Sequence, residues 1–101
     1  MTFHPVPQAA QLQPGKGTTV SVAGKRVALF NLNGELRAID DTCPHVGAPL
    51  GGGWIDGGTV ACPMHGWEFD IKTGKGVTVP GCSVKTYEVR NNDGIFEIAI
   101  N

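Results

Sequence analysis

The stretch that decides the fold of this chain covers residues 43–70 and reads CPHVGAPLGGGWIDGGTVACPMHGWEFD. It opens with Cys43-Pro44-His45, and after 16 further residues it continues with Cys62-Pro63-Met64-His65. Each end therefore supplies one thiol and one imidazole from a short, proline-containing loop. The intervening residues 46–61 contain six glycines and a single charge, at Asp56. Because loops that fold closely around a compact inorganic group need glycine, the pattern indicates a metal site built from two matched loops.

The order of the candidate ligands favours one kind of metal centre. A zinc finger commonly takes two cysteines from one loop and two histidines from another, whereas each loop here has one of each. This interleaving suits a dinuclear iron–sulfur cluster in which Cys43 and Cys62 bind one iron and His45 and His65 bind the other. A mononuclear zinc site with the same four ligands is the alternative that remains open.

The rest of the chain is typical of short strands joined by tight turns. Fifteen glycines and seven prolines in 101 residues leave little room for long helices. Residues 18–22 alternate as a half-buried strand does, and residues 25–31 are apolar on both faces, which predicts a strand that is covered on both sides. Asn33-Gly34 predicts a hairpin returning through residues 35–39, and Asn91-Asn92-Asp93-Gly94 predicts another between residues 84–90 and 95–100. We therefore expect an all-β fold, with Phe96, Ile98 and Ile100 on one inner face.

Composition excludes several functional classes. Eight basic and nine acidic residues give a net charge of −1, and no basic block could neutralise several phosphates, so nucleic acid is not an expected partner. No apolar run in the first half approaches the ~20 residues that span a bilayer, and the N-terminus lacks the features of a secretory signal. Three cysteines cannot all pair. We expect a single domain over residues 1–101, located in the cytoplasm and without a membrane partner.

The two loops resemble those of the Rieske-type [2Fe–2S] ferredoxins. The family pattern C-x-H, then 15–17 residues, then C-x₂-H is met by Cys43, His45, Cys62 and His65. The flanking residues are similar as well: Gly47, Leu50 and Gly53 after the first loop, Gly66-Trp67-Glu68-Phe69-Asp70 after the second, and the turn at Thr73-Gly74. The resemblance implies the Rieske fold, an antiparallel sandwich or barrel-like base that carries a small cluster-binding subdomain, with its loops at about residues 42–70. It also implies one Rieske [2Fe–2S] cluster held by the four residues named.

The resemblance further implies a low-potential type of protein. High-potential Rieske proteins have an extra cysteine in each loop, joined in a disulfide, and the corresponding positions here are Ala48 and Met64. They also place serine and tyrosine hydroxyls where this chain has Trp67 and Phe69. Since the chain shows no membrane anchor either, a respiratory-complex subunit is excluded.

Electron transfer is the predicted function, and catalysis is not. Ring-hydroxylating oxygenases react at a separate iron held by two histidines and a carboxylate, but only His4 remains once His45 and His65 are assigned. The resemblance implies a soluble carrier between a flavin-dependent reductase and a terminal oxygenase, docking through an uncharged tip framed by residues 44, 46, 63 and 64. The alternatives are the small subunit of an NAD(P)H nitrite reductase and a redox- or iron-sensing binding protein.

Several conspicuous residues receive structural interpretations. Asp40 and Asp41 are expected to be a solvated pair at the end of a strand, and Trp54 is expected to be a packing residue. Cys82 is expected to be a partly buried thiol with no metal-binding role. For Trp67 and Phe69, core packing and shielding of the cluster stay equally open.

Overall fold

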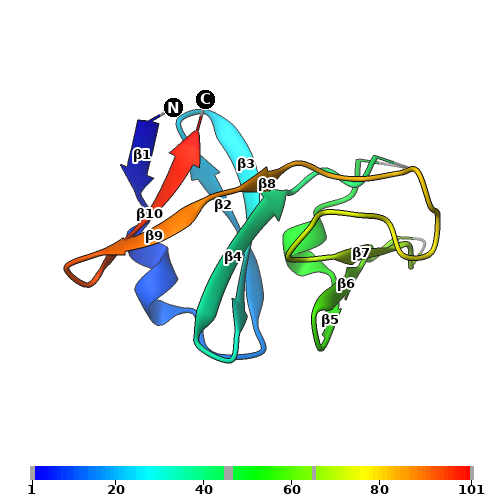
Figure 1. Ribbon diagram of the computed structural model, residues 1–101, viewed down its shortest axis with the longest axis horizontal. Coiled ribbons are helices and arrows are strands. Elements are labelled where there is room, and N and C mark those ends of the chain that lie inside the picture. The colour runs from blue at the N-terminus through cyan, green and yellow to red at the C-terminus, as the bar shows by residue number, and fades with distance from the viewer. Residues whose placement is uncertain (1, 45–46, 65, 101) are drawn as a thin grey trace.

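Antiparallel strands make up most of the protein, as the sequence predicts (Figure 1). The structure is a computed structural model that describes residues 2–44, 47–64 and 66–100. Three sheets are present in these ranges, with strand orders β1-β10-β9, β2-β3-β4-β8 and β5-β6-β7. The first two sheets form the base of the molecule, and the third forms a small subdomain at the opposite end of the long axis (Figure 1).

The four-stranded sheet is built from successive hairpins. It contains β2 (Gly17–Val22), β3 (Lys25–Leu32), β4 (Glu35–Asp40) and the short β8 (Thr86–Tyr87). The turn between β3 and β4 has φ values of 56° at Asn33 and 95° at Gly34. Both are left-handed, as a two-residue hairpin turn requires, so the predicted hairpin is confirmed.

The three-stranded sheet of the base joins the two ends of the chain. It contains β1 (Thr2–Pro5), β10 (Ile95–Ile100) and β9 (Val89–Asn92). β1 pairs with β10. The short 3₁₀ helix η1 (Pro7–Gln11) follows β1 in the chain. The predicted C-terminal hairpin is present, but residues 84–90 do not form one strand. They divide into β8, which pairs with β4, and β9, which pairs with β10.

Strand β3 separates two hydrophobic clusters. Val27 and Leu29 face the base cluster, whereas Ala28 and Phe30 face the loop cluster, and all four side chains are 0% exposed. The prediction of a strand covered on both sides is thus confirmed. The base cluster also contains Val6, Ala9, Val20, Val22, Leu36, Ala38, Tyr87, Ile98 and Ile100, with Phe96 packed against it. The loop cluster also contains Ile39, Cys43, Ala48, Leu50, Val60, Cys62, Phe69 and Ile71.

The subdomain is a three-stranded meander of very short strands: β5 (Trp54–Asp56), β6 (Thr59–Ala61) and β7 (Glu68–Asp70). A second 3₁₀ turn, η2 (Leu50–Gly52), leads into it from β4. At Gly53 a side chain would collide with the backbone carbonyl of Ala61, so glycine is needed there for β5 to approach β6. This close approach brings the chain after the first loop alongside the strand that leads into the second.

Candidate metal centre

The two loops that carry the predicted ligands are closed by the same pair of backbone hydrogen bonds. In the first, the Cys43 N–H donates to the Ala48 carbonyl (3.0 Å) and the Gly47 N–H donates to the Cys43 carbonyl (2.7 Å). In the second, the Cys62 N–H donates to the Trp67 carbonyl (2.8 Å) and the Gly66 N–H donates to the Cys62 carbonyl (2.9 Å). Each loop is therefore a six-residue turn closed on the backbone of its own cysteine.

A glycine at the fifth position makes each turn possible. The φ angle is 74° at Gly47 and 73° at Gly66, in the left-handed region where side chains with a Cβ are strained. The sequence repeats cysteine, proline and glycine at positions one, two and five of each loop. This repeat explains why two segments nineteen residues apart in the sequence share the same closing hydrogen bonds and the same left-handed glycine.

Both cysteine side chains are held in an apolar environment. Cys43 is 1% exposed and Cys62 is 0% exposed, and both belong to the loop cluster together with Leu50 and Phe69. An isolated thiolate in such surroundings would carry a large desolvation cost, which coordination to a metal offsets. Two buried sulfurs at equivalent positions of matched turns thus fit the cysteine half of a Rieske centre.

The predicted histidine ligands, His45 and His65, lie outside the described residues, as does Val46 of the predicted tip. In the sequence they occupy the third position of the first loop and the fourth position of the second. Among the described residues no group of three His, Cys, Asp or Glu side chains gathers that could hold a metal ion. At the tip, Pro44 is exposed, Pro63 is half-buried and Met64 is 66% exposed.

Asp41 is a residue whose role the sequence interpretation missed. The prediction of a solvated Asp40–Asp41 pair is wrong for Asp41, which is only 1% exposed. Its Oδ1 accepts hydrogen bonds from the Thr19 hydroxyl (2.8 Å) and from the Gly51 N–H (2.9 Å), and its Oδ2 lies 3.2 Å from the guanidinium of Arg26. Its backbone carbonyl also accepts the Leu50 N–H (2.6 Å). Asp41 therefore fastens both ends of the first loop to the base.

The second loop is supported by a long segment that runs back along β7. The Val77 N–H donates to the Glu68 carbonyl (2.8 Å), and the Glu68 N–H donates to the Thr78 hydroxyl (3.0 Å). The predicted turn at Thr73-Gly74 is present, closed by Asp70, whose Oδ1 accepts the N–H of Thr73 (3.2 Å). Residues 77 and 78 therefore lie against β7 as a fourth segment beside the three strands of the small sheet.

The aromatic residues and the third cysteine fall into distinct environments. Phe69 is 1% exposed in the loop cluster, and Trp67 is partly buried against the same cluster. Cys82 is partly buried, as predicted, in the segment that supports the second loop. The prediction that Trp54 is a packing residue is wrong, because its side chain is 68% exposed.

A hollow of about 590 Å³ lies away from the loops. Lys72 and Glu35, which form an ion pair with 3.8 Å between Nζ and Oε1, are both in its lining. Neither Cys43 nor Cys62 lines it. The lining residues are Gly15, Asn31, Leu32, Asn33, Glu35, Ile55, Gly57, Gly58 and Lys72.

The chain is similar in sequence to relatives of known function. The chain is 39% identical over 72 residues to the ferredoxin component of the naphthalene 1,2-dioxygenase system of Pseudomonas putida, an alignment that covers 70% of this chain and 69% of that protein. It is 36% identical over 97 residues to the 4β-methylsterol monooxygenase of Methylococcus capsulatus, covering 85% of this chain. The chain spans only 26% of that monooxygenase, so it corresponds to one part of the larger enzyme.

Solved structures share the fold over the whole chain. The ferredoxin of carbazole 1,9a-dioxygenase from Nocardioides aromaticivorans IC177 superposes with a TM-score of 0.91 at 28% identity, covering 100% of both chains. A chain from the complex of reduced oxygenase and oxidised ferredoxin in carbazole 1,9a-dioxygenase has a TM-score of 0.87 at 30% identity, covering 96% of this chain and 92% of that one. A protein described as the small subunit of a putative NADPH nitrite reductase has a TM-score of 0.84 at 28% identity, covering 99% and 100%.

The described part of the chain has no helix long and apolar enough to cross a membrane. The Rieske [2Fe–2S] domain matches residues 2–88, a range that includes both loops, the small sheet and the four-stranded sheet of the base. The predicted cofactor and fold are thereby confirmed. With the matched turns, the two buried sulfurs and this match taken together, the chain belongs to the Rieske [2Fe–2S] domain family.

Proposed function

We propose that the protein is a one-electron carrier whose Rieske cluster is held by Cys43, His45, Cys62 and His65. The observation that carries the proposal is the equivalence of the two cysteine turns, which have the same hydrogen bonds and the same left-handed glycine. In Rieske centres two cysteines ligate one iron and two histidines ligate the other. We further propose that residues 1–101 form a single Rieske domain whose cluster-binding loops span about residues 42–70.

The cofactor supplies the chemistry, since a Rieske cluster takes up and releases a single electron. The protein holds the two sulfur ligands out of water, because Cys43 and Cys62 are buried among Leu50, Val60 and Phe69. Neither Trp67 nor Phe69 has a hydroxyl to donate to a reduced cluster, and Ala48 and Met64 cannot form the disulfide of the high-potential proteins. These features support a reduction potential at the low end of the Rieske range of about −150 to +300 mV.

The proposed partners are a flavin-dependent reductase as electron donor and a terminal oxygenase as acceptor. The relatives support this role, because ferredoxin components of the naphthalene and carbazole dioxygenase systems share the sequence or the fold, and one such ferredoxin structure is a complex with its oxygenase. The cytoplasm is the proposed location, because its thiol-reducing conditions keep unligated cysteines such as Cys82 reduced.

A second candidate role is a permanent small subunit of a nitrite reductase. The similarity to the protein described as such a subunit favours it, since the two chains cover each other almost completely. The roles differ in how long the complex lasts. A carrier dissociates between electron transfers, whereas a subunit co-purifies with its large partner in a fixed ratio.

The experiment that tests the proposed centre combines metal analysis with EPR of the reduced protein. We expect about two irons and two acid-labile sulfides per chain. Replacing His45 or His65 by cysteine abolishes the Rieske EPR signature even where a cluster is retained, because nitrogen ligation at one iron produces that signature. One zinc per chain without sulfide, in protein prepared anaerobically, would overturn the proposal.

A further inference from the structure

Exposed hydrophobic side chains are concentrated at the cluster-loop end of the molecule. Of the four large hydrophobic side chains that are mainly exposed in the described residues, three lie here: Trp54 (68%), Met64 (66%) and Val77 (52%). The fourth, Ile95 (54%), lies beside the turn between β9 and β10, at the far end (Figure 1). A tryptophan side chain that is this exposed gains little from packing within the protein. Exposed hydrophobic side chains gathered at one end of a molecule indicate a surface that binds a partner.

Strand register places several of these side chains on one surface. Trp54 is paired with Ala61, and Ala61 is paired with Glu68. Because residues directly opposite each other in an antiparallel ladder project to the same side, the three side chains form a row on the outer face of the small sheet. Val60 and Phe69, on the alternate face, are buried in the loop cluster.

This row borders the cluster loops. Ala61 is followed directly by Cys62, and Glu68 begins β7 at the end of the second loop. Val77 continues the row, because its N–H donates to the Glu68 carbonyl (2.8 Å). A molecule lying on the row would therefore also reach the tip of the loops.

Carboxylates surround the exposed tryptophan. Asp56, Thr59 and Asp70 form the next row of the same face, so this face carries three acidic side chains with Glu68 included. Lys75 lies beside Asp70, whose N–H donates to the Lys75 carbonyl (2.8 Å). Its single positive charge offsets only one of the three carboxylates, so the face remains negatively charged. No ion pair within the described residues uses Asp56 or Glu68.

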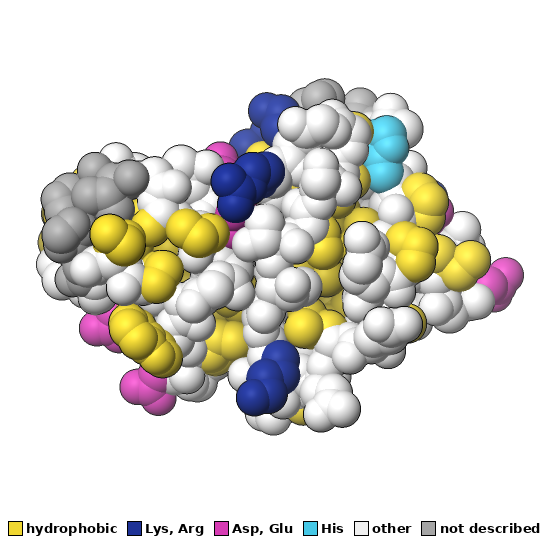
Figure 2. Space-filling model, turned by 180° about the vertical axis from the view of Figure 1, so that it is seen from behind, with side chains coloured by type: hydrophobic (Ala, Val, Ile, Leu, Met, Phe, Trp, Pro, Cys, Tyr) yellow, Lys and Arg dark blue, Asp and Glu magenta, His cyan; other side chains and the backbone are white. Residues whose placement is uncertain are grey.

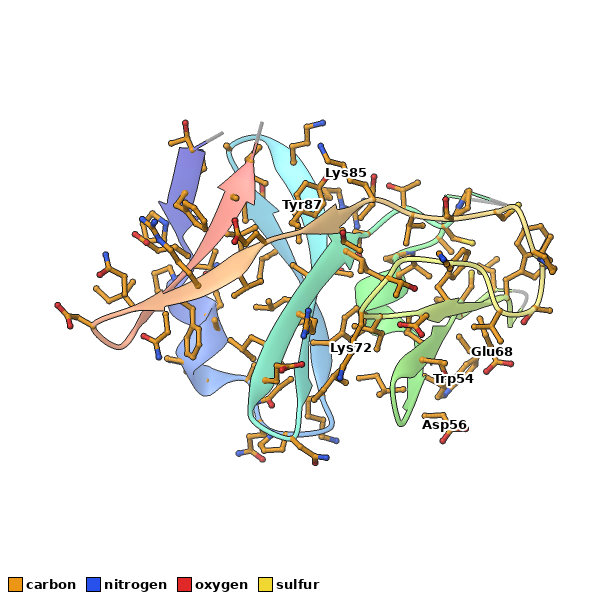
Figure 3. The ribbon with its side chains drawn as sticks, viewed as in Figure 1. Trp54, Asp56, Glu68, Lys72, Lys85 and Tyr87 are labelled. Atoms are coloured by element: carbon orange, nitrogen blue, oxygen red, sulfur yellow. The ribbon has the colours of Figure 1, made fainter. Side chains whose placement is uncertain are left out.

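The figures agree with this placement of the exposed hydrophobic and acidic side chains on the small sheet. Figure 3 shows Trp54, Asp56 and Glu68 projecting together from the small sheet, away from the base. Figure 2 shows the same end from behind, with hydrophobic side chains near the grey atoms and acidic side chains below them. On that view the Lys and Arg side chains lie toward the middle of the molecule.

We propose that the outer face of the small sheet, formed by Trp54, Asp56, Ala61, Glu68 and Val77 and here named the docking face, binds the basic surface of a redox partner protein. The inference rests on the proposed electron-carrier function and adds to it the surface used and the charge of the partner. Trp54 inserts into an apolar depression of the partner, and Lys or Arg side chains around that depression meet Asp56 and Glu68. Contacts of this kind suit a transient redox complex, which buries less than about 1,200 Å².

A lysine-rich one-electron carrier, mitochondrial cytochrome c, serves as the probe. In the first experiment a carbodiimide joins carboxylates of the oxidised protein to lysines of cytochrome c, and mass spectrometry locates the links. We expect cross-links from Asp56 and Glu68, and none from Asp93 in the turn between β9 and β10. Cross-links that favour Asp93, or that spread evenly over the acidic residues, would overturn the proposal. This readout does not depend on electron transfer.

In the second experiment the protein is reduced with dithionite, and stopped-flow absorbance follows the transfer of one electron to the ferric haem, which becomes ferrous. We expect Trp54→Ala to lower the second-order rate constant roughly tenfold, as truncating a central tryptophan anchor does. Asp56→Asn and Glu68→Gln are each expected to lower it about twofold to fivefold at low ionic strength, with a weaker salt dependence. The matched controls at the far end, Ile95→Ala and Asp93→Asn, are expected to leave it within about 1.5-fold of the wild type.

The outcomes that would reject the docking face differ from the outcome that would reject the electron-carrier function. Equal effects of Asp56→Asn and Asp93→Asn would mean that only net charge matters, and the docking face would be wrong. An unchanged rate in Trp54→Ala, with normal circular dichroism and iron content, would also reject it. If dithionite-reduced wild-type protein failed to reduce even the small oxidant ferricyanide, the electron-carrier function itself would fail, while the cross-linking result would still decide the docking face.

Discussion

Replacing Asp41 by alanine would remove the carboxylate that fastens the first cluster loop to the base. Three groups depend on this side chain: the Thr19 hydroxyl at 2.8 Å, the Gly51 N–H at 2.9 Å and the Arg26 guanidinium at 3.2 Å. The variant would leave the buried Gly51 N–H without its acceptor. We expect a large loss of stability and incomplete loading of the cluster.

The size of the effect follows from the burial of each contact. A hydrogen bond to a charged group contributes roughly 1.5–3 kcal/mol, and two such bonds reach Asp41 from Thr19 and Gly51. The Arg26 side chain is 65% exposed, so its ion pair adds only about 0–1 kcal/mol. A total of about 3–7 kcal/mol is a large part of the ~5–15 kcal/mol that stabilises a domain. At roughly 4–8 °C per kcal/mol for a domain of this size, the melting temperature should fall by about 12 °C or more.

The assay is thermal melting of the iron-loaded protein by circular dichroism at one fixed scan rate, together with iron content per chain. Asp40→Ala is the matched control, because Asp40 is the neighbouring carboxylate and makes one exposed hydrogen bond, from the Thr42 N–H (3.0 Å). That control should lose only about 1 kcal/mol. Arg26→Gln should change the melting temperature by no more than about 8 °C. If Asp41→Ala melted no lower than Asp40→Ala, the anchoring role of Asp41 would be refuted.

Three further predictions concern the aromatic residues and the third cysteine. Phe69→Tyr places one oxygen in the loop cluster, which also contains the proposed cysteine ligands Cys43 and Cys62. A hydrogen bond of about 1.5–3 kcal/mol to the reduced state would raise the midpoint potential by up to roughly 60–130 mV. Protein-film voltammetry showing no rise in a correctly loaded variant would count against this prediction. Cys82→Ser should leave iron content and EPR unchanged, and loss of the cluster would show that Cys82 is a ligand. The pKa of Tyr87 is raised above its ordinary 10.0, first by burial and then by the charge of Asp40. Because neutral Tyr87 is favoured in the fold, its contribution to stability is complete below pH 10 and is lost as the pH rises through the raised pKa. Since the chain has one tyrosine, absorbance near 295 nm should titrate late in the folded protein and earlier in Asp40→Asn, and a titration at the ordinary pKa would contradict the shift.

The turns and strand faces were readable from the sequence because they depend on neighbouring residues. Asn33-Gly34 takes left-handed backbone angles that few other pairs tolerate, so the hairpin follows from the dipeptide itself. Likewise, the apolar residues of β3 reveal its burial on both faces, since successive side chains alternate. The spacing of cysteine, histidine and glycine in the two loops belongs to the same class of local information.

Strand pairing and burial in the assembled fold were not readable in this way. β1 pairs with β10 from the opposite end of the chain, and residues 84–90 divide between two sheets. Nothing near Asp41 in the sequence distinguishes it from Asp40, because the partners that bury it, Thr19 and Arg26, are 22 and 15 residues away.

The kind of centre, the family and the hairpin turns could be inferred from the sequence, because ligand type, ligand spacing and left-handed backbone angles are properties of short segments. The carboxylate that anchors the first loop and the tryptophan that faces solvent could be identified only in the folded protein. Asp41 is buried and Trp54 is 68% exposed, the reverse of what their polarity predicts. The physical reason is that burial depends on which distant segments pack against a residue, and the small sheet covers its inner face with the loop cluster while its outer face has no covering element among the described residues.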